Sequence, residues 1–285
     1  MPPPPLTYVF PPDETARRGW VRVLSAISVR ARGLARRSRE PAAESIHDLR
    51  LLIKRVRALL WFARPALAAP VAERARTRLR RAARLLAGQR DRAVMQATLE
   101  KLAKKASDDR DRAAVAHVFR SLVQDPAAGG AGEKSPRSTL RKAVGILCRA
   151  VDELKRRAAD RAGWPSPGKR LAKAFHATRK AGKKARRTGK DTDFHAWRKK
   201  TKTLLYQLEL TQAEPGGRMA RVLKRVANLQ DTLGAYHDCV VVEEQLRRML
   251  PLPLAARRVA DLLGKRKVHL RKRACPIARR LDASI

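Results

Sequence analysis

Two distant segments carry histidine and cationic residues at the same spacing. In each, a histidine is followed three residues later by arginine and seven residues later by lysine: His47, Arg50 and Lys54 in the first segment, and His195, Arg198 and Lys202 in the second. Arginine and lysine donate charge-assisted hydrogen bonds to phosphate oxygens, and protonated histidine can do the same. The spacing therefore favours phosphate binding. It does not favour acid–base catalysis, because the aspartate that follows His47 points away from it on a helix.

The elements that must position these residues are amphipathic helices. At about 100° per residue, His47, Arg50, Lys54 and Arg57 lie within an arc of about 80°. The opposite arc of this first helix is apolar and holds Leu49, Leu52, Ile53, Val56, Leu59 and Leu60. In the second copy Lys199 and Tyr206 flank the cations, and the core arc holds Trp197, Leu204 and Leu208. Each helix thus predicts one face for its own core and a cationic stripe on the other side.

Neighbouring helices carry basic rows of their own. These rows comprise Arg76, Arg80 and Arg84 in the first half, and Arg221, Lys224, Arg225 and Asn228 in the second. A single basic stripe is most often a solvated face, but like charges at i and i+4 cost stability unless an anion lies on them. Because the stripe occurs twice in register with few neutralising acids, we interpret it as a binding surface.

The charge of the whole chain points to a polyanionic partner. In 285 residues, 66 are Lys or Arg and 26 are Asp or Glu, which gives a net charge of +40. Such an excess repels itself in a folded protein, so nucleic acid, an anionic membrane or an inorganic polyanion is expected as a partner. Three widely spaced cysteines, no signal peptide and no apolar run of membrane-spanning length favour a cytoplasmic protein without a membrane partner.

Apolar residues recur at intervals of three and four, which predicts an all-α fold. Helices are expected at about 13–38, 41–63, 66–87, 91–106, 109–124, 137–161, 168–186, 193–212, 217–235, 238–250 and 254–282. Residues 1–12 read as a Pro-rich tail and about 125–136 as a Gly- and Pro-rich linker. On either side lies a helical repeat, at about 13–124 and 137–282, which predicts two four-helix bundles related by a pseudo-twofold axis. Asp91 and Asp238 are interpreted as N-caps.

The motifs H-x-x-R-x-x-x-K-x-x-R at 47–57, H-x-x-R-K-x-x-K at 195–202 and LQDTLGAYHD at 229–238 resemble the conserved histidine α-helical domain (CHAD) family. The resemblance covers about 13–282. It implies that inorganic polyphosphate binds along a basic cleft or pore, that the protein associates with polyphosphate granules, and that the histidines do no catalysis. Phosphate or sulfate ions would mimic the ligand. This chain departs from the family at Leu205, where an arginine is usual, and at Gly88, which lies one place later than the family's glycine.

The residues predicted to bind polyphosphate are His47, Arg50, Lys54, Arg57, Arg76, Arg80, Arg84, Arg90, His195, Arg198, Lys199, Lys202, Tyr206, Arg221, Lys224, Arg225, Asn228 and His237. We expect no catalytic residue, metal or cofactor, because acidic residues do not gather opposite the cations. A dense anion favours protonated histidine, so binding should strengthen below neutral pH. The alternative is sequence-independent binding of the DNA or RNA backbone, against which only 4% of residues are aromatic. The sequence does not predict an oligomeric state.

Overall fold

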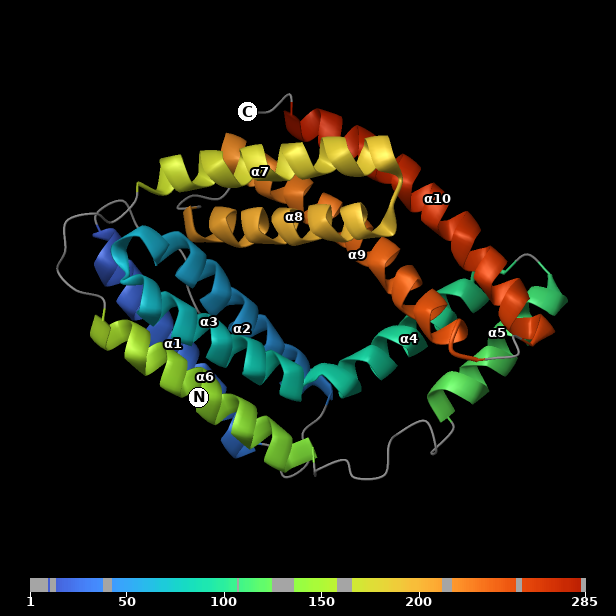
Figure 1. The fold of residues 1–285 in the computed structure, drawn as a ribbon, viewed down its shortest axis with the longest axis horizontal. Helices are drawn as coiled ribbons and strands as arrows, with labels where there is room; N and C mark the ends of the chain where they lie inside the picture. The colour runs from blue at the N-terminus through green and yellow to red at the C-terminus, as the bar shows by residue number, and fades with distance from the viewer. Residues whose placement is uncertain are drawn as a thin grey trace. The chain divides into compact units, whose positions relative to one another are not determined.

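The computed structural model describes residues 10, 14–37, 43–106, 108–124, 136–157, 166–211, 217–249 and 253–282, and this part of the chain is helical without a strand (Figure 1). The α-helices are α1 (Ala16–Arg37), α2 (Ala43–Ala63), α3 (Ala69–Leu85), α4 (Ala87–Ala103), α5 (Asp109–Phe119), α6 (Pro136–Arg157), α7 (Pro167–Thr188), α8 (Asp191–Thr211), α9 (Arg218–Leu246) and α10 (Leu254–Asp282). A 3₁₀ turn, Arg64–Ala66, follows α2, and a π-helical turn, Arg120–Gln124, follows α5. The predicted all-α class is confirmed.

The chain divides into two compact units, each assembled from separate stretches of sequence. The first unit comprises residues 1–88, 134–175 and 203–223, and the second comprises 89–133, 176–202 and 224–285. Helices α7, α8 and α9 contribute residues to both. The predicted linker at 125–136 lies almost entirely outside the described residues, and so does most of the tail at 1–12.

In the first unit, α1, α2, α3 and α6 lie side by side around a common core (Figure 1). Trp20 of α1 is fully buried, and its indole N–H donates to the carbonyl of Leu59 in α2 over 3.3 Å. Phe10 packs edge-on against Phe62, with 5.6 Å between ring centroids. Burial of these large aromatic groups holds α2 by its apolar side, which leaves its cationic side away from the core.

In the second unit, aromatic side chains hold α7, α8 and α9 together. Phe194 of α8 stacks on Tyr236 of α9 with 4.6 Å between ring centroids. Trp197 of α8 lies so close to Gly182 of α7 that a Cβ added there would meet its indole at 2.8 Å. The amino-terminal part of α8 is therefore fixed by its neighbours α7 and α9. Elsewhere in this unit, Arg258 of α10 donates from Nε to Asp111 of α5 over 2.6 Å, which joins those two helices.

Two predicted helix boundaries are wrong. The predicted break between 235 and 238 does not exist, because α9 is continuous from Arg218 to Leu246. Its buried residues recur at three and four throughout: Val222, Val226, Leu229, Leu233, Tyr236, Cys239, Val242 and Leu246. This burial outweighs the roughly 1 kcal/mol that a helical glycine such as Gly234 costs. Asp238 therefore lies inside a helix, and its predicted role as an N-cap is wrong.

The break predicted near residue 88 lies earlier, at Leu86, between the end of α3 and the start of α4. Leu86 is buried, with φ −100° and ψ 13°, and its backbone N–H donates to the carbonyl of Ala83 over 3.3 Å. Because α4 already begins at Ala87, Asp91 lies within the helix, and its predicted role as an N-cap is also wrong.

Candidate functional site

The predicted amphipathic faces are confirmed on both histidine-bearing helices. The whole apolar arc of α2, from Leu49 to Leu60, is buried, with no member more than 7% exposed. On α8, Trp197, Leu204 and Leu208 are 1%, 0% and 0% exposed. His47, on the opposite side of α2, is exposed. The cationic residues therefore lie where helix geometry predicted them, at the surface or at its edge.

In the first unit, arginines from α2 and α3 lie close to one another. The pKa of the Arg57 guanidinium is lowered by partial removal from water and by the charges of Arg80 and Arg76. Arg76 also pairs with Glu73 at 2.8 Å, whereas no ion pair or hydrogen bond to a described residue is found for Arg57 or Arg80. We call Arg57, Arg76, Arg80 and Arg84, all exposed, the first basic row.

Arg50 differs from the other cations of its stripe. Its Nη1 donates to the carbonyl of Leu86 over 2.6 Å, at the junction between α3 and α4, and its side chain is half-buried. A cation at a helix carboxyl end satisfies a carbonyl that the helix leaves open. Arg50 thus contributes to the fold of the first unit, in addition to its predicted role. The side chain of Arg90 lies outside the part of the chain that the structure describes.

In the second unit, two predicted histidines from different helices meet. His195 of α8 and His237 of α9 have their Nδ1 atoms 3.4 Å apart and their ring centroids 4.5 Å apart. Burial, followed by the charges of Lys199 and Arg198, lowers the pKa of His195, while Glu244 opposes the shift. His195 is therefore held in an environment that disfavours its protonated form.

The remaining predicted residues differ in exposure. On α8, Lys199 is exposed, Arg198 and Lys202 are half-buried, and Tyr206 is buried, with 7% of its surface exposed. On α9, Arg225 is half-buried and donates to the carbonyl of Arg280 over 3.3 Å. Lys54 is half-buried, whereas the remaining members are exposed: Arg221, Lys224 and Asn228. Tyr206 and Arg221 belong to the first unit, and the other residues of α8 and α9 named here belong to the second.

A charged network beside the histidine pair was missed by the sequence analysis. The Asp191 carboxylate, at the start of α8, accepts hydrogen bonds from the Tyr236 hydroxyl and, over 2.8 Å, from Lys267 of α10. Lys267 also donates to Glu243 over 2.7 Å, and Arg271 donates to the Tyr236 oxygen over 2.6 Å. In the sequence, the one feature that indicated this network was the i, i+4 spacing of Lys267 and Arg271, which places both cations on the same face of a helix.

This network fixes the charge of its members. Burial alone would raise the pKa of Asp191, but hydrogen bonds from Lys267 and Tyr236 outweigh it, so the pKa is lowered. Burial would likewise lower the pKa of Lys267, but its bonds to Asp191 and Glu243 raise it. Asp191 and Lys267 thus remain ionised and tie the start of α8 to α9 and α10.

Within the described ranges, no three His, Cys, Asp or Glu side chains are grouped as metal ligands. Nor does any described helix combine the length and the apolar character that crossing a bilayer requires.

The fold and its surfaces define an all-helical protein with arginine-rich helix faces. The family model of the CHAD domain matches residues 22–247, and the chain belongs to this family. The crystal structure of the CHAD domain from the plant Ricinus communis is similar in fold, with a TM-score of 0.66 and 17% sequence identity, over 97% of this chain and 93% of that one. No curated protein matches the sequence.

Proposed function

We propose that this protein binds inorganic polyphosphate without catalysis, through the predicted arginine, lysine and histidine residues. The observation that carries the proposal is the first basic row, where partial burial and then the nearby charges of Arg80 and Arg76 lower the pKa of Arg57. Like charges held together in this way gain stability when an anion lies between them. A linear polyphosphate offers repeated oxygens and no base edges, which suits a surface of cations that lacks an obvious aromatic platform.

The family supports this proposal, because CHAD domains as a family bind polyphosphate. We propose accordingly that the protein is cytoplasmic, associates with polyphosphate granules and needs no cofactor. The internal repeat, its pseudo-twofold relation and the basic cleft stay predictions. So do the domain limits of 13–282 and the individual contacts of the predicted residues, including Tyr206 and Arg90.

The competing function is binding of the DNA or RNA backbone, which the net charge of +40 also favours. A competition experiment separates the two. Labelled long-chain polyphosphate is bound to the protein in near-physiological salt, and unlabelled polyphosphate or duplex DNA is added at matched phosphate concentration. We expect polyphosphate to displace the label at a concentration at least about tenfold lower. Equal displacement by DNA would reduce the function to general polyanion binding.

Polyphosphate binding should be accompanied by proton uptake at the histidine pair. In the free protein the pKa of His195 lies below its ordinary value of about 6.5. A bound polyanion beside His195 and His237 stabilises the protonated form, so affinity should rise as pH falls from about 7 to about 6. Titration calorimetry in buffers of different ionisation enthalpy measures the protons taken up. His195→Gln should reduce this number, and an unchanged number would show that the pair is remote from the ligand.

A further inference from the structure

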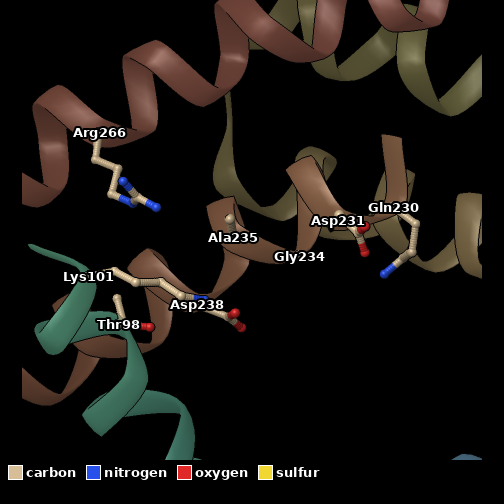
Figure 2. A pocket seen from close by; sticks show the side chains of 8 residues that line it. All are labelled: Thr98, Lys101, Gln230, Asp231, Gly234, Ala235, Asp238 and Arg266. Atoms are coloured by element: carbon tan, nitrogen blue, oxygen red, sulfur yellow. The ribbon is translucent and has the colours of Figure 1, made fainter. Parts of the chain in front are cut away.

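The second unit contains a pocket of about 300 Å³ that the basic rows do not use. It lies between α4, α9 and α10, and Figure 2 shows its lining side chains. These are Thr98, Lys101, Gln230, Asp231, Gly234, Ala235, Asp238 and Arg266. Most of them belong to the segment LQDTLGAYHD, of which only His237 entered the predicted polyphosphate site. This volume falls at the lower end of the range that small-molecule sites occupy, about 300–1,000 Å³.

One end of the pocket is cationic. Lys101 of α4 and Arg266 of α10 reach toward it from different helices (Figure 2). No ion pair or hydrogen bond between either side chain and another described residue is found, although the structure pairs many other cations of this unit, Lys267 among them. Two such cations facing one pocket favour an anion, and an arginine fork with a lysine suits phosphate.

The other end offers hydrogen-bond acceptors. Gln230 is 9% exposed, and its buried Oε1 accepts no hydrogen bond from the described residues. A buried carbonyl oxygen without a donor is costly. Figure 2 shows the amide nitrogen of Gln230 on the pocket side, so a ligand N–H group reaches the oxygen when the terminal amide flips and exchanges the two atoms. Asp231 is exposed beside it and adds a carboxylate. Asp238 also lines the pocket and engages other residues as well; Figure 2 shows it near Lys101, at the end that holds the two cations.

The floor between the two ends is bare. Gly234 and Ala235 present almost no side chain, and a Cβ added at Gly234 would meet nothing within 4 Å. A glycine in the middle of a helix costs stability relative to alanine, so its presence here is not explained by the helix itself. It leaves room for a ligand to lie across α9.

We propose that this pocket binds a small phosphate monoester that also carries N–H donors. The phosphate lies against Lys101 and Arg266, and the donors face Gln230 and Asp231. Inorganic phosphate would leave the Gln230 end unused, and an uncharged amine would leave the two cations with no anion other than the Asp238 carboxylate. This site is separate from polyphosphate binding by the basic rows and does not depend on it.

Ligand-observed NMR and titration calorimetry on the full chain test the proposal. The bipolar probes are AMP, whose donors are on an aromatic amine, and O-phosphoethanolamine, whose donors are on an ammonium group. The controls are inorganic phosphate and adenosine, each of which carries only one end of the pattern. We expect one of the bipolar probes to bind at least about tenfold more tightly than both controls. If neither probe does so, the pocket holds water and the proposal is wrong.

The variant Gly234→Leu places a side chain on the pocket floor, and Gly234→Ala is its matched control. We expect Gly234→Leu to abolish probe binding and Gly234→Ala to leave most of it. Both should unfold at or above the wild-type temperature, because both residues favour a helix more than glycine does. Arg266→Gln should weaken the phosphate probe about tenfold or more. Polyphosphate affinity should be unchanged in Gly234→Leu, and probe binding that survives this variant would place the ligand elsewhere.

Discussion

Reversing two charges of the first basic row should weaken polyphosphate binding by at least about tenfold in near-physiological salt. The variant is Arg57→Glu with Arg80→Glu, on α2 and α3. Both arginines are exposed, and both belong to the first basic row, where partial burial and then the charges of Arg80 and Arg76 lower the pKa of Arg57. Glutamate at these positions repels the ligand and relieves the repulsion by Arg76, so the folded protein should lose no stability. Fluorescence anisotropy of labelled polyphosphate gives the affinity, and thermal unfolding gives the stability.

The matched control changes the net charge by the same amount elsewhere in the first unit. Lys142→Glu with Arg149→Glu reverses two exposed cations of α6 that take no part in the predicted site. We expect this control to lower the affinity by less than about threefold, because distant exposed charges are screened beyond about 8 Å at physiological ionic strength. Equal loss in both variants would mean that net charge, and no particular surface, binds the ligand. Arg50 is a poorer choice, because its bond to Leu86 couples any charge reversal to folding.

The largest expected effect on stability comes from Asp191→Ala in the second unit. The substitution removes the acceptor of Lys267, Arg271 and the Tyr236 hydroxyl. Since Lys267 is only 12% exposed and keeps one carboxylate, Glu243, we expect a loss of about 3 kcal/mol in the free energy of unfolding. Urea unfolding at neutral pH measures it.

Acid should reproduce part of this loss in the wild-type protein. The pKa of Asp191 is lowered in the folded state, so its stabilisation is present above its unfolded value of about 4 and is lost as pH falls through the folded value. The control for Asp191→Ala is Glu73→Ala, which should change the stability far less, because both partners of the Glu73–Arg76 pair are exposed and water screens their attraction. If Asp191→Ala cost no more than Glu73→Ala, the network would contribute no stability.

The boundaries of α9 show how sequence patterns of different kinds compete. One helix was expected to end at residue 235 and the next to begin at 238, and the nearby Gly234 is a local signal against a helix. The apolar spacing from Val222 to Leu246 continues through both, and it decided the outcome because burial along a whole helix outweighs one glycine. The information was present in the sequence, but weighing the two signals required knowing which face would be buried.

By itself, the sequence determined the helical class, the buried face of α2 and α8 and the side on which the cations lie, because the 3.6-residue period fixes direction around a helix. Tertiary structure alone decided which of those cations and histidines meet. Arg50 bonds to Leu86, His195 meets His237, and Lys267 reaches Asp191, across sequence separations of 36, 42 and 76 residues. A helical period carries no information about such separations. They follow from how whole helices pack, and this packing also forms the pocket over Gly234.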